Sequence, residues 1–174
     1  MTNDAATPNR PRLDAESIFE TAERIERTGA EFYEKQAGHS RRSATRDLLR
    51  QLAEMERSHE RTFREMRRTM LPAEDIATGV GAESYLRAAA DSHVFAVYRH
   101  ADLLTGYENP EEVIRTALAF EKDTVVFFVS MRELVADDKG RAQIARMVRE
   151  ERKHIAMLSA HLQSLQECAE PAGQ

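Results

Sequence analysis

The sequence has one cysteine, Cys168, among its 174 residues. A single cysteine can form neither an internal disulfide nor a cysteine-based zinc or rubredoxin-type iron site, and this favours a reducing, cytoplasmic setting. No run approaches the roughly 18 uninterrupted apolar residues of a membrane span, and the N-terminal stretch MTNDAATPNRPR lacks the apolar core of a signal peptide. We therefore expect a cytoplasmic protein with no membrane partner.

A strong excess of one charge is also missing. The chain carries 30 acidic and 25 basic residues, for a net charge of −5, and its arginines are spread along the sequence without forming one basic block. This distribution argues against a nucleic-acid partner. With 41% hydrophobic residues, a chain of this length fits one domain with a sizeable core.

No segment alternates apolar and polar residues with a period of two, so we expect no β-sheet. Apolar residues recur at every third or fourth position, and this spacing predicts helices throughout. Four main helices are expected at about 14–38, 43–70, 110–136 and 139–166, with a crossover helix at about 82–105. Gly38 is a candidate stop for the first of them. Residues 1–13 and 167–174 are predicted tails on one domain spanning 14–166.

The lengths of the connections bear on topology. Short turns join the first helix to the second and the third to the fourth, which predicts two antiparallel hairpins. The segment between the hairpins is much longer and contains a helix of its own. The sequence therefore predicts an all-α four-helix bundle made of two helical hairpins and a long helical crossover, and not an up-down-up-down bundle with short loops.

The segment AEMERSH places Glu56 and His59 three residues apart on a predicted helix. Alone, such a pair is weak evidence for a metal site, because both residue types are common on solvated helix faces. A shift of 95 residues, however, aligns EMERSH with REERKH and repeats the pair as Glu151 and His154. The repeat indicates an internal duplication of a helical hairpin.

The same shift aligns a lone glutamate, Glu26, with a second one, Glu121. Each precedes the first residue of its Glu-x-x-His pair by 30 residues, and the midpoint of each interval falls in or beside a predicted turn. Positions equidistant from the turn of an antiparallel hairpin lie side by side, here on the order of 20 Å along each helix. If the two halves pack about an approximate twofold, four carboxylates and two imidazoles converge at the middle of the bundle.

The four glutamates lie inside the apolar stripes of their helices. Burying four carboxylates costs several kcal/mol per ion unless cations compensate them. Flanking arginines such as Arg57 and Arg152 point away from these stripes. Two divalent metal ions could neutralise the carboxylates, with neutral imidazoles completing the coordination. A polar network or a cluster of shared protons is the alternative that needs no metal.

Four segments resemble the rubrerythrin and ferritin-like di-iron family: ERTGAEFY (26–33), LAEMERSHE (52–60), FEKDTVVFF (120–128) and REERKHI (149–155). The resemblance runs over about residues 15–165 and implies a ferritin-like fold with two iron ions. The implied roles are terminal ligands for Glu26 and Glu121, bridging ligands for Glu56 and Glu151, and one metal each for His59 and His154. The ligand types also admit manganese or zinc.

The resemblance further implies a homodimer whose reduced site reacts with hydrogen peroxide or dioxygen. Rubrerythrins carry a rubredoxin-like module with four cysteines, which this chain lacks, so a separate electron donor protein is expected. They also have an additional glutamate three residues after the ligand that corresponds to Glu121, where this chain has Thr124. The sequence is most similar to the stand-alone ferritin-like proteins related to rubrerythrin.

Tyr33 follows Glu26 by about two helical turns and could donate a hydrogen bond near the site. An ordinary core aromatic is the favoured alternative, because Phe128 occupies the duplicated position and has no hydroxyl.

Three functions are compatible with these patterns. The first is a di-iron oxidoreductase that reduces hydrogen peroxide, or oxidises Fe(II) with peroxide or dioxygen. The second is an iron-binding or storage protein. The third is a structural bundle whose zinc or manganese does no redox work.

Overall fold

The computed structural model describes residues 15–69, 109–135 and 137–168. In these residues it contains no strand and four helices, α1 (Ala15–His39), α2 (Ser43–Thr69), α5 (Pro110–Leu134) and α6 (Asp138–Glu167). The predicted all-α class is confirmed. The predicted crossover helix at 82–105 lies outside the described residues. None of the described helices is long and apolar enough to cross a membrane.

The helix boundaries follow from local capping. Asn109 accepts a hydrogen bond from the Glu111 backbone N–H (3.2 Å) at the start of α5, and Asp137 accepts one from the Gly140 N–H (2.7 Å) at the start of α6. The prediction that Gly38 ends the first helix is wrong by one residue. The Ser40 N–H donates to the Gln36 carbonyl (3.0 Å), and this α-helical bond keeps the chain helical across Gly38.

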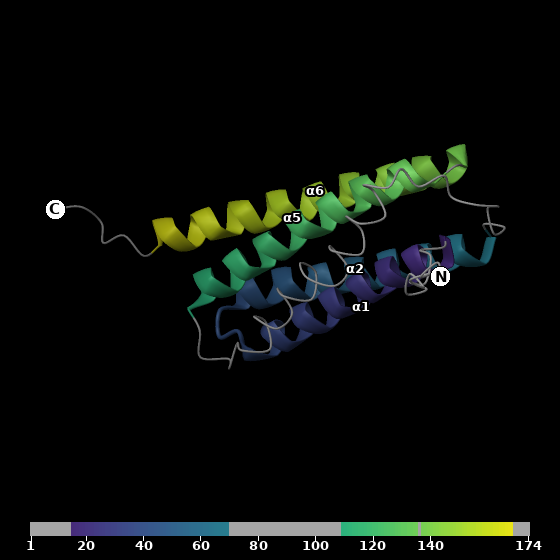
Figure 1. The fold of residues 1–174 in the computed structure, drawn as a ribbon. Helices are drawn as coiled ribbons and strands as arrows, with labels where there is room; N and C mark the ends of the chain where they lie inside the picture. The colour runs from purple at the N-terminus through teal and green to yellow at the C-terminus, as the bar shows by residue number, and fades with distance from the viewer. Residues whose placement is uncertain (1–14, 70–108, 136, 169–174) are drawn as a thin grey trace, which may run out of the picture.

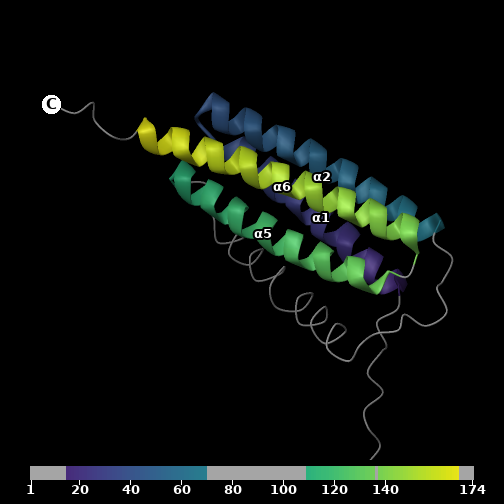
Figure 2. The same cartoon turned by 90° about the horizontal axis from the view of Figure 1, so that it is seen from above.

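The helices form two hairpins that pack face to face. Within each hairpin α1 lies along α2 and α5 along α6, and between the hairpins α1 faces α5 while α2 faces α6 (Figures 1 and 2). Figure 1 shows that α2 ends and α5 begins at opposite ends of the bundle. These two helices therefore run in the same direction, which excludes an up-down-up-down arrangement.

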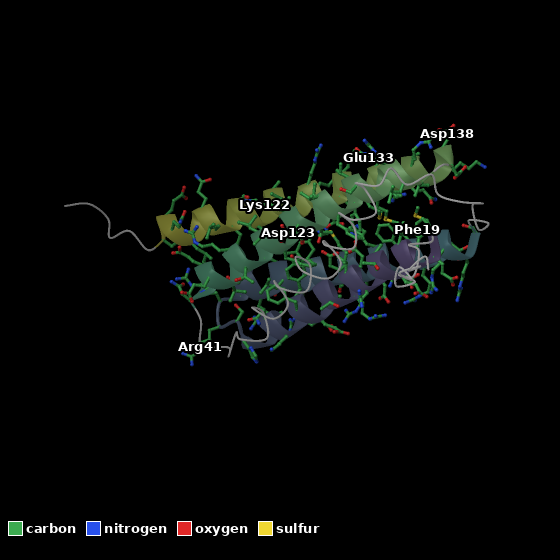
Figure 3. The ribbon with its side chains drawn as sticks, in the orientation of Figure 1. Phe19, Arg41, Lys122, Asp123, Glu133 and Asp138 are labelled. Atoms are coloured by element: carbon green, nitrogen blue, oxygen red, sulfur yellow. The ribbon has the colours of Figure 1, made fainter. Side chains whose placement is uncertain are left out.

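The core lies between the two hairpins. Phe19 is buried there, while the charged side chains of Arg41 and Asp138 are exposed near the turns at opposite ends of the bundle (Figure 3). Phe63 of α2 packs on Phe128 of α5 with ring centroids 4.8 Å apart. Aromatic contacts of this kind join the hairpins through apolar surface.

Glu23 of α1 is a buried carboxylate that has its own cations. Its side chain accepts a hydrogen bond from Arg67 Nε (2.7 Å), and Arg64 Nε lies 3.7 Å from its second oxygen. Both arginines are on α2, so these ion pairs join the two helices of the first hairpin. They show how an arginine can compensate a carboxylate in this bundle.

Gly29 of α1 allows a close approach of three helices. A Cβ at this position would lie 2.9 Å from Cε1 of Phe120 on α5 and 3.5 Å from Cγ of Glu56 on α2. The first distance is shorter than a normal carbon contact, and Phe120 is itself buried. A side chain at Gly29 would therefore displace the Phe120 ring.

We predict opposite effects of alanine at the two glycines of α1. Gly29→Ala should lower the free energy of unfolding by about 1–3 kcal/mol, because overpacking outweighs the gain in helix propensity. Gly38→Ala is the matched control, since nothing lies within 4 Å of a Cβ there, and it should raise stability by up to about 1 kcal/mol. Urea denaturation of both variants measures the difference. A stabilising Gly29→Ala would contradict the close packing.

Candidate metal centre

Six side chains from the four helices meet in the interior of the bundle. The helices α1 and α5 each contribute one glutamate, and α2 and α6 each contribute a Glu-x-x-His pair. The exposed fractions are 0% for Glu26, Glu121 and Glu151, 1% for Glu56 and His154, and 7% for His59. All six side chains are therefore buried in the bundle.

Each histidine points Nδ1 at three carboxylates. From His59 Nδ1 the oxygens of Glu151, Glu26 and Glu56 lie at 2.8, 3.6 and 3.6 Å. From His154 Nδ1 the oxygens of Glu151, Glu56 and Glu121 lie at 2.9, 3.1 and 3.4 Å. The two imidazole rings are stacked, with centroids 5.3 Å apart and an interplanar angle of 15°.

These distances divide the glutamates into two kinds. Glu56 and Glu151 lie close to both histidines, whereas Glu26 approaches His59 and Glu121 approaches His154. The ligand atoms accordingly form two groups of four, each within 4.8 Å: Glu26, Glu56, His59 and Glu151, and Glu56, Glu121, Glu151 and His154. The two groups overlap at Glu56 and Glu151.

Within the described ranges, most of the polar atoms in this cluster have no hydrogen-bond partner. The unpartnered atoms are both oxygens of Glu26 and Glu151, Oε1 of Glu56, Oε2 of Glu121, Nδ1 of His59 and both ring nitrogens of His154. The histidine nitrogens and carboxylate oxygens therefore lie close together, but their relative orientation is not that of a hydrogen bond. Buried polar atoms left in this way cost about 1–3 kcal/mol each. Cations bound between them would satisfy these atoms, so the residues fit a metal site.

Burial and mutual repulsion set the protonation of the carboxyls. Burial, followed by the negative charges of Glu151 and Glu56, raises the pKa of Glu26 well above its usual value. Burial and the charge of Glu56 likewise raise the pKa of Glu121. Burial opposes ionisation of Glu56 too, but contacts with Glu26 and the histidines outweigh it and lower that pKa.

The imidazoles respond in the opposite direction to ordinary buried histidines. Burial alone would lower the pKa of His59, but the carboxylates of Glu151, Glu26 and Glu56 raise it to about 12. The pKa of His154 is also raised, because Glu121, Glu151 and Glu56 outweigh its burial. Without a metal, both imidazoles therefore hold protons at neutral pH and partly balance the carboxylates.

Tyr33 connects the first hairpin to the cluster. It is fully buried on α1, and its hydroxyl donates a hydrogen bond to Oε1 of Glu121 on α5. Burial and the charges of Glu121 and Glu56 raise the pKa of Tyr33, so the phenol stays protonated and remains a donor. The sequence favoured an ordinary core aromatic, and the contact with Glu121 shows that the hydroxyl is engaged. The aligned position in the second half, Phe128, has no such group.

Thr124 of α5 is a further buried residue, and its sequence position alone predicted no function for it. Its side chain is 1% exposed, and its hydroxyl has no hydrogen-bond partner in the part of the chain that the structure describes. The available signal was its position, a polar residue in an apolar stripe three residues after Glu121. His161 lies two turns beyond His154 and is engaged elsewhere, because its Nε2 is 2.8 Å from the hydroxyl of Thr45.

The rubrerythrin family model matches residues 17–162. No curated protein matches the sequence significantly. Among solved structures, the fold is similar to that of a candidate ferritin-like diiron-carboxylate protein from Thermotoga maritima, with 18% identity, a TM-score of 0.65, and coverage of 88% of this chain and 97% of the other. That likeness confirms the predicted ferritin-like fold. Because the family model covers most of its length, the chain belongs to the rubrerythrin family.

Proposed function

We propose that the chain is a non-haem di-iron oxidoreductase. Its carboxylate-bridged pair of iron ions would serve to reduce hydrogen peroxide, or to oxidise Fe(II) with peroxide or dioxygen. The ligands in this proposal are Glu26 and Glu121 as terminal carboxylates, Glu56 and Glu151 as bridges, and His59 and His154 as one imidazole each. The observation that carries it is the overlap of two four-ligand groups at Glu56 and Glu151.

The charges of the cluster support two divalent cations. Four carboxylates supply up to four negative charges, and in the described part of the chain the ion pairs that they form are with His59 and His154. Among the described residues, the positive charge that pairs with these carboxylates is thus that of protonated imidazoles, and a ring nitrogen that carries a proton cannot bind a metal. Two divalent ions would replace those protons and match the four carboxylates.

Two ferrous ions held by these residues would supply the two electrons that, with two protons, reduce hydrogen peroxide to two molecules of water. The residues of the chain position and protect this chemistry. Glu56 and Glu151 would hold the two ions together, and the buried setting would exclude bulk water. Tyr33 orients Glu121 through its hydroxyl and keeps a proton near the site.

The proposal includes two partners. Cys168 is the only cysteine in the sequence, so no four-cysteine iron site can deliver electrons from within it. Electrons would come from a separate donor protein, in a cytoplasmic setting. The chain is further proposed to form a homodimer. A dimer that binds no more than two irons per chain would rule out cage-like storage, and size measurement with iron titration decides this.

We predict that hydrogen peroxide, dioxygen or both oxidise the di-ferrous protein when they are rapidly mixed with it. After mixing, the near-ultraviolet absorption of ferric iron should appear, and each chain should give two electrons to the oxidant. An anaerobic sample without oxidant is the control. If neither oxidant produces this absorption, the redox proposal is wrong. Two tightly bound zinc or manganese ions in the protein as isolated would then favour a redox-silent site.

Substitutions should separate the terminal from the shared ligands. Glu26→Gln should lower the affinity for one metal ion by more than about tenfold and leave the other ion bound, whereas Glu56→Gln should lower the affinity for both ions. Glu23→Gln is the matched control, because Glu23 is also buried on α1 but pairs with arginines. It should lower stability and keep both metals. Metal titration monitored by elemental analysis gives the stoichiometry, and equal losses in Glu26→Gln and Glu56→Gln would contradict the assignment of roles.

Metal binding should release protons and strengthen as the pH rises. Ligands must be deprotonated, and the surrounding carboxylates raise the pKa of His59 to about 12 and raise that of His154 as well, so both imidazoles hold protons at neutral pH. Burial also raises the pKa values of Glu26 and Glu121 above their usual range. Affinity for Zn²⁺ should therefore keep rising from about pH 6 to pH 8.5, with the imidazole protons of His59 and His154 released on binding. An ordinary histidine site would level off above about pH 6.5. Calorimetry in buffers of different ionisation enthalpy measures the release, and a flat profile above pH 7 would refute the prediction.

A further inference from the structure

Thr124 of α5 has a buried hydroxyl that no group of the described chain satisfies. The side chain is 1% exposed and Oγ1 has no hydrogen-bond partner. An unsatisfied buried hydroxyl is costly, because it has lost its hydrogen bonds to water without replacing them. A bound ligand that forms a hydrogen bond with the Thr124 hydroxyl would remove this cost.

Other helical hydroxyls of this protein show that an intrahelical partner is easily found. In the described residues, five donate to the backbone carbonyl four residues earlier at 2.8–3.0 Å, namely Thr28, Thr62, Thr69, Thr116 and Ser130. A threonine in a helix reaches this carbonyl by rotating about one bond. Thr124 does not make the equivalent bond, so its hydroxyl is left for a different acceptor.

The surroundings of Thr124 indicate where that acceptor lies. Glu121 is one helical turn earlier on the same face, and side chains so spaced have their Cβ atoms about 5–6 Å apart. Oε1 of Glu121 accepts a hydrogen bond from Tyr33, whereas Oε2 has no partner. A hydroxyl donor and a carboxylate acceptor, both buried and both unpartnered, therefore stand one turn apart at the edge of the six-residue cluster.

We propose that Thr124 binds the small ligand of the metal centre, with its hydroxyl donating a hydrogen bond to an oxygen or nitrogen atom held beside Glu121. The ligand class is a small hydrogen-bond acceptor, which is water at rest and peroxide when substrate is present. This inference rests on the proposed di-iron function and assigns a substrate-binding residue to it. Thr124 is flanked along α5 by the buried rings of Phe120 and Phe128, so the hydroxyl supplies polar recognition in an apolar wall.

Three variants test this proposal in the full chain. Thr124→Val removes the hydroxyl and keeps the shape, and Thr124→Ser keeps the hydroxyl. Thr45→Val is the matched control, because Thr45 is equally buried in a helix but its hydroxyl is bonded to His161. In the metal-free protein, Thr124→Val should leave Tm unchanged or raise it, whereas Thr45→Val should lower Tm by about 2–4 °C. A fall in Tm for Thr124→Val as large as that for Thr45→Val would reveal a structural partner and overturn the proposal.

Azide serves as the probe of ligand binding in the ferric, iron-loaded protein, followed by its absorption. Thr124→Val should weaken azide binding by about threefold to tenfold, the loss of one hydrogen bond, while Thr124→Ser and Thr45→Val stay within about twofold of the wild type. Equal azide affinity in the wild type and Thr124→Val, or no azide binding by the wild type, would overturn the inference with two irons still bound. Failure of the wild type to bind iron would instead overturn the proposed function, and this inference with it. Iron analysis of each sample distinguishes the two.

Discussion

The placement of four carboxylates at one level in the core is the constraint on which the rest of the structure depends. Each would be unfavourable alone in apolar surroundings, and together they repel one another. The fold brings two histidines to the same level, and their charge is the compensation within the cluster. Glu23 shows the contrast, since its arginines are supplied by the protein itself. Among the described residues, the ion pairs of the central cluster are instead with His59 and His154, so its carboxylates have no arginine partner of this kind there.

The four helices and the level of the six-residue cluster could be predicted from the sequence. They follow from the helical period of the apolar residues and from the spacing of the glutamates and histidines. The helical period gave the four helices to within one or two residues, and the repeat of Glu56 and His59 as Glu151 and His154 put six side chains at one height. The convergence is visible in a sequence because equidistance from a turn fixes it. Helix ends were less certain. The start of α6 depends on the cap from Asp137, and the end of α1 depends on the hydrogen bond from Ser40 to Gln36 across Gly38. In both places several hydrogen bonds of similar energy compete, so the exact terminal residue is hard to predict.

Contacts between the two hairpins could not be predicted from the sequence, for a different reason. The bond from Tyr33 to Glu121 joins residues 88 positions apart. The sequence raised a hydrogen bond from Tyr33 near the site but favoured an ordinary core aromatic, because Phe128 at the repeated position has no hydroxyl. The sequence shows Thr124 three residues after Glu121, but it cannot show whether the hydroxyl has a partner, since composition does not tell which rotamer a buried threonine adopts or what faces it. Both residues break the symmetry of the two halves, and both do so on the side of Glu121. The duplicated framework thus places the cluster, and unrepeated residues make its two halves chemically different.

The cross-pairing of histidines and glutamates has a consequence for how such a centre could arise. His59 of the first hairpin lies nearest to Glu151 of the second, and His154 lies within 3.1 Å of Glu56 of the first. One hairpin therefore holds only half of a site and gains the other half when it meets a partner like itself. Two identical hairpins related by a twofold axis would present the same six side chains. Joining two copies in one chain then frees each half to change alone, which a symmetric pair of separate chains can never do.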